Sequence, residues 1–600
     1  MPGAGRHRRR IRLALPVAAA GVAAAVAAAL LTASAGAATA LPKPTVKPVT
    51  SSASLAELER RVAGAVEGDD IAGEPAKKSS YGASTGTSTG TGAMVIGGTT
   101  TSITSAPWMA QLWYFDDQGT TDEADDLGFF CGGTVVSPTK ILTAAHCVKG
   151  YDWFNYGTVV TGTAQLPTAD EAGNVDLHGG TASLPHRQWN HPSYNATTID
   201  NDIAVITLAN PVKATPIRMA TATDTASYAA GTNAKVYGWG RTSSTSQDIS
   251  ETLKTATLPI QSDSTCTGFY GGEFVKGHMV CAGTPASGSD SGTTSACNGD
   301  SGGPLVVNGR IVGVVSWGVQ DCVAKGAYSV FSKVSSYVGA TYPRVDDTNI
   351  SGDHRADIWL RTASTKTGYS RDSNGTSFGA RESWGDWNGV NLVLQTDLDR
   401  DGYQDLVYRG SSDGAMYWAH FVPASGTWAT KTIFSNWKTR TRVIAPGDVN
   451  GDYLPDMLSV DSAGVLWVYP GKGNGTFSAP FKSSTNWNQY NMVRGHGDLT
   501  GDGIPDLLAR STSGGHIYLL KGTGKTGTGT FAPRVKVRTW ATYTGFDAVG
   551  DVTGDGKADF LARSSAGTLY LYPGTGKATS EIFATPKSVG TDYKQYDIFG

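Results

Sequence analysis

Three short segments carry a histidine, an aspartate and a serine that could act together as a nucleophile and its base. They are Leu-Thr-Ala-Ala-His-Cys around His146, Asn-Asp-Ile-Ala-Val around Asp202, and Gly-Asp-Ser-Gly-Gly-Pro around Ser301. A serine hydroxyl is a poor nucleophile at neutral pH and must pass its proton to a base during attack. We expect His146 to be that base, and Asp202 to hold the ring in the accepting tautomer while staying ionised. These residues predict acyl-transfer chemistry.

The three segments together resemble the trypsin/chymotrypsin family, from Val95 to about Val338. The chain order His, Asp, Ser is the family's order and differs from that of subtilisins and α/β-hydrolases. The resemblance implies an all-β, chymotrypsin-like double barrel with serine endopeptidase activity that needs no cofactor for catalysis. Glycines beside the serine allow a tight turn, so the N–H groups of Gly299 and Ser301 can converge on the developing oxyanion. An inactive homologue is the alternative.

All six cysteines lie in this stretch. Behind an export signal they indicate disulfide bonds, because no Cys-x-x-Cys spacing suggests a zinc site. Spacing alone leaves many pairings open. The family resemblance selects Cys131 with Cys147, Cys266 with Cys281, and Cys297 with Cys322.

The resemblance places the floor of the specificity pocket two residues before Cys297, at Ser295. Trypsins carry an aspartate there that pairs with Lys or Arg, so a neutral serine argues for large apolar or aromatic residues before the cut. Asp290 and Asp321 are the alternative, since either carboxylate could swing in and restore a basic preference. The substrate backbone is expected to add as a strand beside residues 316–318. The implied substrate-binding residues are Ser295, Ser316, Trp317, Gly318 and Gly326.

The run Val-Ile-Gly-Gly that begins at Val95 resembles the family's mature N-terminus. Cutting the Met94–Val95 bond would create an ammonium that pairs with Asp300, the residue before the serine, and orders the oxyanion hole. Because Met94 precedes the cut instead of Lys or Arg, a trypsin-like activator is not implied.

Beyond the last cysteine, variants of the loop Asp-x-Asp-x-Asp-Gly-x-x-Asp recur at intervals of roughly fifty residues, and an apolar strand follows each loop. Side chains at positions one, three, five and nine, with the carbonyl at position seven, could converge on Ca²⁺. Polar β-turns without a metal are the alternative. The candidate ligands, loop by loop, are Asn349, Ser351, Asp353, Arg355 and Asp357; Asp397, Asp399, Asp401, Tyr403 and Asp405; Asp448, Asn450, Asp452, Leu454 and Asp456; Asp498, Thr500, Asp502, Ile504 and Asp506; and Asp551, Thr553, Asp555, Lys557 and Asp559.

These repeats resemble the FG-GAP or VCBS repeats of integrin-like β-propellers. The C-terminal segment from Tyr593 to Gly600 resembles the strands that enter the later loops, yet no further loop follows it. No obvious equivalent strand precedes the first loop at Asn349. A five-bladed ring in which the last strand completes the first blade explains both facts and removes exposed sheet edges. An open or larger assembly is the alternative.

The N-terminus predicts export. A basic stretch precedes an Ala-, Val- and Leu-rich run and then small residues, as in a signal peptide. A permanent membrane anchor is the alternative. The segment that follows is rich in Ala, Pro, Ser, Thr and Gly, and we expect it to be a propeptide. Within it, the spacing of apolar residues from Leu55 to Val66 predicts one short helix. The expected divisions are 1–37, signal peptide; 38–94, propeptide; 95–344, protease domain; and 345–600, propeller.

The composition limits the partners. The chain of 600 residues has a formal net charge of -3 and a pI near 6.4, so no basic field attracts nucleic acid or, after signal cleavage, an anionic membrane. We expect a secreted, extracellular endopeptidase that acts on protein or peptide. Its propeller would stabilise it or bind extracellular matrix or polysaccharide. The rival hypothesis is a calcium-dependent adhesion or carbohydrate-binding protein with a protease-like module.

Overall fold

The computed structural model describes residues 40–48, 52–67 and 95–600, except 121, 123–124, 171, 221, 223, 247, 320, 346–347, 354, 423, 453 and 556. The expected signal peptide and the residue before the expected activation cut therefore lie outside the described residues. Pro42–Gly600 form one compact unit. Within the described ranges, no helix is both long and apolar enough to cross a membrane.

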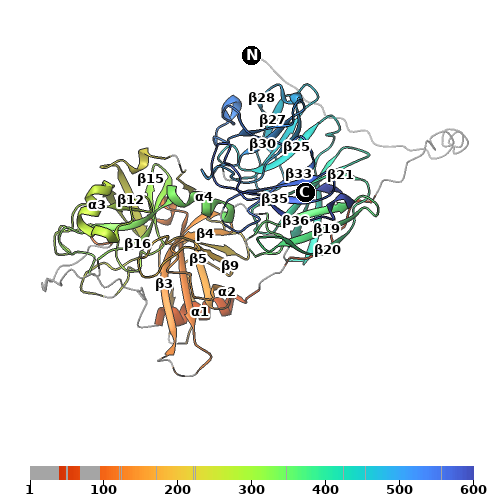
Figure 1. Ribbon diagram of the computed structural model, residues 1–600. Coiled ribbons are helices and arrows are strands. Elements are labelled where there is room, and N and C mark those ends of the chain that lie inside the picture. Colours follow the sequence, from red (N-terminus) through yellow and green to blue (C-terminus); the bar gives the residue numbers. More distant parts are fainter. Residues whose placement is uncertain are drawn as a thin grey trace, which may run out of the picture. The chain divides into compact units, whose positions relative to one another are not determined.

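The protease region folds into two mainly antiparallel sheets, the two half-barrels of the expected all-β fold (Figure 1). The first sheet has the order β8 (Thr181–Ser183), β5 (Gly157–Thr161), β2 (Met109–Asp116), β3 (Leu127–Ser137), β4 (Lys140–Thr143), β10 (Ala204–Leu208) and β9 (Pro185–Asn190). The second has the order β1 (Thr99–Thr100), β13 (Lys254–Pro259), β12 (Asn233–Gly238), β15 (Pro304–Val307), β16 (Arg310–Trp317), β17 (Ser329–Lys333) and β14 (Met279–Ala282), with β11 (Arg218–Met219) parallel to β16. Strands β6 (Thr168–Ala169) and β7 (Val175–Asp176) form a separate pair. Strands β4, β5 and β10 are buried along their whole length.

The helices are few and short. The α-helices are α1 (Leu55–Glu67), α2 (Trp153–Tyr156), α3 (Asp263–Tyr270) and α4 (Val334–Val345). The 3₁₀ helices are η1 (Ile103–Ser105), η3 (Ala226–Tyr228), η4 (Gly271–Glu273), η5 (Trp487–Gln489), η6 (Gly527–Gly529) and η7 (Tyr593–Gln595).

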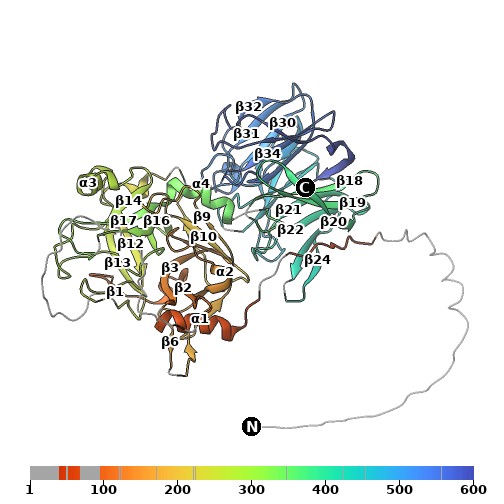
Figure 2. The ribbon, with the colours of Figure 1, turned by 60° about the horizontal axis from the view of Figure 1, so that its bottom comes forward.

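Helix α1 is the helix expected within the propeptide, and its apolar face lies against β2, β3 and β5 (Figure 2). Val62 and Ala65 are fully buried and belong to the same apolar core as the strands of the protease region. The Arg61 guanidinium donates a hydrogen bond to the carbonyl of Gly157 at 2.9 Å. This part of the segment expected to be the propeptide is therefore packed into the protease domain.

The second half consists of five four-stranded antiparallel sheets, the blades of a propeller (Figure 1). Blade 1 contains β20 (Phe378–Asp386), β19 (Thr367–Ser373), β18 (Ile358–Thr362) and β37 (Tyr596–Phe599). Blade 2 contains β21 (Val390–Thr396), β22 (Asp405–Gly410), β23 (Met416–Val422) and β24 (Thr427–Phe434), and blade 3 contains β25 (Arg442–Gly447), β26 (Asp456–Val460), β27 (Leu466–Tyr469) and β28 (Phe481–Ser484). Blade 4 contains β29 (Tyr490–Arg494), β30 (Leu507–Ser511), β31 (His516–Leu520) and β32 (Val535–Thr539), and blade 5 contains β33 (Tyr543–Gly550), β34 (Asp559–Ser564), β35 (Leu569–Tyr572) and β36 (Lys587–Gly590).

The C-terminal strand closes the ring. Strand β37 pairs with β18 in blade 1, with Leu360 opposite Phe599 and Arg361 opposite Ile598. One terminal strand of each blade faces the axis, and each lies beside the axial strands of both neighbouring blades, including β33 beside β37 and β37 beside β21. The predicted five-bladed propeller, completed by its last strand, is confirmed.

Candidate active site

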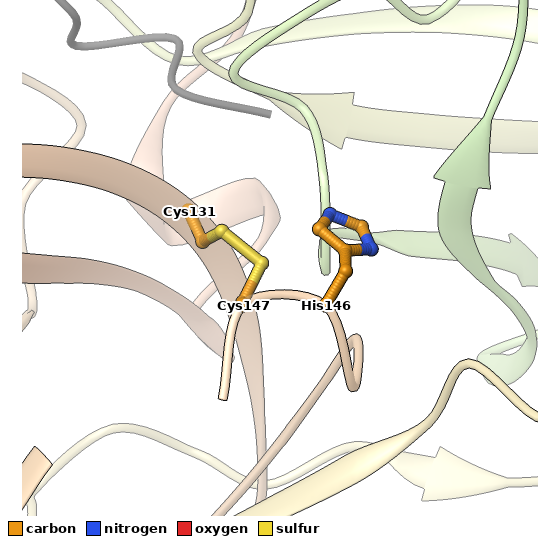
Figure 3. A group of neighbouring side chains, drawn as sticks. All are labelled: Cys131, His146 and Cys147. Carbon is orange, nitrogen blue, oxygen red and sulfur yellow. A yellow bond between two sulfur atoms is a disulfide. The ribbon is translucent and has the colours of Figure 1, made fainter. Parts of the chain in front are cut away.

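The structure contains the three disulfide bonds that the family resemblance implied. The Cys131–Cys147, Cys266–Cys281 and Cys297–Cys322 pairs have Cα–Cα distances of 6.4, 6.1 and 5.5 Å. The first bond fixes the turn that carries His146 to β3, and the imidazole ring leaves this turn beside the disulfide (Figure 3). Because both sulfurs are bonded to each other, neither is available as a metal ligand at this place.

Two paired strands bring His146 and Asp202 together. Strand β4 ends at Thr143 and β10 begins at Ala204, and these two residues face one another in the antiparallel register. In an antiparallel pair the end of one strand lies beside the start of its neighbour. His146 follows Thr143 and Asp202 precedes Ala204, so both reach the same edge of the sheet.

The Asp202 carboxylate contacts His146 at two atoms, the backbone nitrogen and the ring Nδ1. Its Oδ1 accepts a hydrogen bond from the backbone N–H of His146, and its Oδ2 lies 2.8 Å from the ring Nδ1. The Ser316 hydroxyl donates to the same Oδ2 at 2.6 Å, and the Ser332 hydroxyl donates to the backbone carbonyl of Asp202 at 2.6 Å. Asp202 is fully buried. Sequence reasoning placed Ser316 only in the substrate strand and missed this contact.

The Ser301 turn is packed directly against the residues that lead to His146. Gly302 has a φ of 78°, and a Cβ there would lie 2.1 Å from Thr143 Oγ1, so only glycine fits. The carbonyl of Ser301 accepts a hydrogen bond from Gly132 N at 2.7 Å. Gly299 has a φ of 90°, and no described residue accepts a hydrogen bond from the N–H of Gly299 or Ser301. These two N–H groups are the expected oxyanion donors.

Comparisons with known proteins agree with this geometry. A trypsin family model matches residues 95–340. The protein named Trypsin from Saccharopolyspora erythraea is 38% identical over 243 residues, which are 40% of this chain and 94% of that protein. Serine protease 1 of Canis lupus familiaris is 35% identical over 245 residues, which are 41% of this chain and 87% of that protein. The chain belongs to the trypsin family of serine endopeptidases. A model of the FG-GAP-like repeat matches residues 397–459 and 498–562 in the propeller.

In this trypsin-family chain, the residue expected at the pocket floor is neutral and held in place. The Ser295 hydroxyl donates to the carbonyl of Cys322 at 2.8 Å, beside the Cys297–Cys322 disulfide. The Asp290 carboxylate accepts hydrogen bonds from the Ser243 hydroxyl and the Ser244 N–H, both at 2.9 Å. The Asp290 carboxylate is therefore hydrogen-bonded to the loop at residues 243–244. Asp321 is exposed.

Of the two glycines expected in the pocket walls, Gly318 faces open space, whereas a Cβ at Gly326 would lie 3.1 Å from the Phe269 ring. A Cβ at Gly318 would meet nothing within 4 Å, and Gly326 has a φ of 89° that favours glycine. Trp317 is buried, and its ring packs edge-on against Tyr270 with centroids 4.8 Å apart. Gly318 directly follows Trp317, the last residue of β16.

The segment expected to become the mature N-terminus lies close to the serine loop. Val95 and Ile96 are fully buried, and the carbonyl of Ile96 accepts a hydrogen bond from Ser295 N at 3.0 Å. The buried Asp300 carboxylate accepts hydrogen bonds from Gly240 N at 2.8 Å and Cys297 N at 2.9 Å. The pocket floor, the activation segment and the serine loop are thus joined by short contacts.

The five loops of the propeller share one pattern of hydrogen bonds between side chains and the backbone. In each loop, the side chain at position one accepts hydrogen bonds from backbone N–H groups three to five residues later. The carboxylate at position five accepts a hydrogen bond from the backbone N–H of the residue at position seven. The position-one acceptors are Asn349, Asp397, Asp448, Asp498 and Asp551. The position-seven donors are Arg355, Tyr403, Leu454, Ile504 and Lys557. The repeated spacing therefore builds the turn itself.

The carboxylate at position nine ties each loop to a following segment. Asp357, Asp405, Asp456, Asp506 and Asp559 are all fully buried. In loops 1, 3, 4 and 5 the Oδ1 atom accepts a backbone N–H, from Ser373, Gly471, Gly522 and Gly574 respectively. In loop 2 the Oδ1 atom of Asp405 is buried without a hydrogen-bond partner among the described residues. Loop 2 thus differs from the other four loops, in which the Oδ1 atom at position nine accepts a hydrogen bond.

Loop 2 has the arrangement that a cation fits. Carboxylate oxygens of Asp397, Asp399 and Asp405 all lie within 4.8 Å of one another, and Asp399 Oδ1 is also buried without a described partner. Burial first, and neighbouring carboxylates second, raise the pKa of Asp397 to about 7 and that of Asp401 to about 9. Orphaned carboxylate oxygens in a buried cluster are the ligands that Ca²⁺ prefers.

Two other loops already contain a cationic side chain. In loop 5, Arg344 of α4 forms a buried ion pair with Asp551 at 2.8 Å. In loop 4, Lys521 lies 3.0 Å from Asp502. The five loops are therefore not equivalent, although their sequences align.

Proposed function

We propose that this trypsin-family chain is a secreted endopeptidase that cleaves peptide bonds through an acyl-enzyme on Ser301. His146 is the general base, and Asp202 orients it and stabilises the imidazolium. The observation that carries the proposal is the buried Asp202 carboxylate, 2.8 Å from His146 Nδ1. With Nδ1 donating to Asp202, the accepting lone pair of the ring is on Nε2.

Each step has a residue in this chain. Ser301 Oγ attacks the carbonyl carbon while His146 Nε2 accepts the hydroxyl proton. The N–H groups of Gly299 and Ser301 stabilise the tetrahedral oxyanion. His146 then passes the proton to the leaving amine as the C–N bond breaks, which leaves an ester on Ser301. Water attacks this ester with His146 again accepting a proton, and the acid product departs with Ser301 restored.

The proposed preference is for large apolar or aromatic residues before the cut. Three observations support it: the neutral Ser295 floor, the open wall at Gly318, and the engagement of Asp290 with the 243–244 loop. A buried pocket without a carboxylate leaves a Lys or Arg side chain uncompensated, at a cost of several kcal/mol. The substrate backbone is proposed to pair with residues 316–318.

Activation is proposed to follow a cut before Val95. The new ammonium would pair with Asp300, which lies beside the serine and is buried among backbone donors. N-terminal sequencing of the active form tests this step. An active form with Val95 still joined to residue 94 would contradict it.

The propeller is proposed to bind Ca²⁺ in loop 2 through Asp397, Asp399 and Asp405. The ion would supply the positive charge that this buried carboxylate cluster needs. We also propose that the propeller binds extracellular matrix protein or polysaccharide near the substrate; the repeat architecture alone supports this step.

A peptide panel tests the proposed activity. Peptides that differ only in the residue before the cut are incubated with the secreted protein and with its Ser301→Ala variant. We expect serine-dependent cleavage after Phe, Tyr or Leu. Cleavage after Lys or Arg would keep the mechanism and overturn the pocket assignment. An adhesion protein would show no Ser301-dependent cleavage, and the known relatives give that alternative no support. Sequencing the protein from culture medium checks secretion.

A further inference from the structure

One arginine recurs on the second strand from the axis in four of the five blades, four residues after the last carboxylate of each loop. These residues are Arg361, Arg409, Arg510 and Arg563. Each uses Nη1 to donate to two backbone carbonyls of the turn that enters the next blade. In blade 3, Val460 stands at this place, and Arg442 on the axial strand donates to the carbonyl of Tyr490 instead. Each of these guanidinium groups is thus hydrogen-bonded to the backbone at the start of the next blade.

Three of these four arginines, Arg409, Arg510 and Arg563, also line a cavity of about 350 Å³ on the propeller axis. The axial strand of every blade contributes to its wall. Exposed residues such as Asn391, Asn491 and Thr544 lie at the cavity, so it opens to solvent. Its volume is within the range of small-molecule sites. The arginines that line it are Arg409, Arg442, Arg494, Arg510 and Arg563.

Few acids balance this positive charge. The lining carboxylate is Asp597, which is paired with Arg361 at 2.8 Å and with Lys366 at 2.7 Å. Behind the cavity, the buried Asp547 faces Arg494, and burial raises the pKa of Asp547 to about 6. Even with both carboxylates ionised, the arginines around the cavity outnumber them. An anion entering the cavity would offset repulsion between like charges.

The guanidinium groups also have donors left for a ligand. A guanidinium has five N–H donors. No described residue accepts a hydrogen bond from Nη2 of Arg409, Arg510 or Arg563. Planar guanidinium forks match the oxygens of carboxylate and phosphate groups.

We propose that this cavity binds a small polyanion, a molecule with two or more negative charges on carboxylate or phosphate oxygens. A polyanion fits better than acetate or chloride because several arginines from different blades face one space. The cavity volume of about 350 Å³ favours a small molecule over a polymer.

Isothermal titration of the full secreted chain, as its Ser301→Ala variant to prevent self-cleavage, tests the proposal. The probes are tricarballylate and inorganic phosphate in a chloride buffer of low ionic strength. We expect saturable binding of at least one, which weakens as salt is added. Acetate should bind at least about tenfold more weakly. The two probes show whether the site prefers carboxylate or phosphate.

The decisive variants are Asn491→Asp and Arg442→Gln. An aspartate at 491 keeps the 2.8 Å acceptor for Arg510 Nε and adds a negative charge to the cavity. Each change should weaken binding about tenfold or more, the scale of a charged hydrogen bond. Arg381→Gln, at an exposed arginine outside the cavity, is the matched control and should bind as the parent does. If Arg442→Gln fails to fold, Asn491→Asp decides. Absence of binding, equal binding of acetate, or undiminished binding by Asn491→Asp would overturn the proposal.

Discussion

Replacing Ser316 by alanine should slow catalysis without weakening substrate binding. Its hydroxyl donates to Asp202 Oδ2 at 2.6 Å in a buried setting, the same oxygen that faces His146 Nδ1. A hydrogen bond to a charged group contributes about 1.5–3 kcal/mol, and about 1.4 kcal/mol corresponds to a factor of ten. We therefore expect kcat to fall about 10- to 100-fold. The backbone of residue 316, which is expected to pair with substrate, is unchanged, so KM should stay close to that of the parent.

Ser332→Ala is the matched control for this variant. Its hydroxyl also donates at 2.6 Å to Asp202 and is equally buried, but its acceptor is the backbone carbonyl. In urea denaturation, Ser332→Ala should lose about 1 kcal/mol of unfolding free energy and Ser316→Ala about 1.5–3 kcal/mol, whereas only Ser316→Ala should lose activity strongly. Asp202→Asn sets the upper limit, at about 10⁴-fold. Equal losses of kcat in the two serine variants would refute the reasoning.

Three further predictions concern specificity, calcium and the propeptide. Ser295→Asp should shift cleavage toward Lys and Arg in a peptide panel; an unchanged preference would show that the pocket floor lies elsewhere. Calcium should raise the Tm of the parent and of Asp551→Asn but not of Asp405→Asn; a similar rise in all three would contradict the assignment to loop 2. Helix α1 should lose helical stability in acid, because Glu57 accepts hydrogen bonds from Arg60 and Arg61 of the same helix. The bond from Arg60, with that from Arg61, lowers the pKa of Glu57 to about 2, so this contribution is complete above about pH 4.5 and is lost as pH falls toward 2. Circular dichroism of a peptide spanning residues 52–67 at pH 7 and pH 2, with Glu57→Gln as the control, checks it, and equal helicity of the parent peptide at both would exclude the effect.

The parts of the site that sequence could predict are those in which one short motif determines the chemistry. The triad segments are local patterns, and the closure of the propeller follows from a missing strand at one end and a spare strand at the other. The contact from Ser316 to Asp202 joins residues 114 positions apart along the chain. Nothing in either local pattern requires it. Sequence spacing also could not show that Arg61 of the propeptide reaches the carbonyl of Gly157.

The five repeat loops show how aligned motifs can differ in their contacts. A buried carboxylate needs compensation from a backbone donor, a cationic side chain or a metal ion. At position nine, four loops use a backbone N–H for Oδ1, as Gly522 does for Asp506. At other positions, Asp551 is paired with Arg344 and Asp502 with Lys521. In loop 2, Asp405 Oδ1 has neither kind of partner among the described residues, and we propose that a cation stabilises it. On this proposal, the partners of the aspartates, and not the aspartates alone, determine which loop binds an ion.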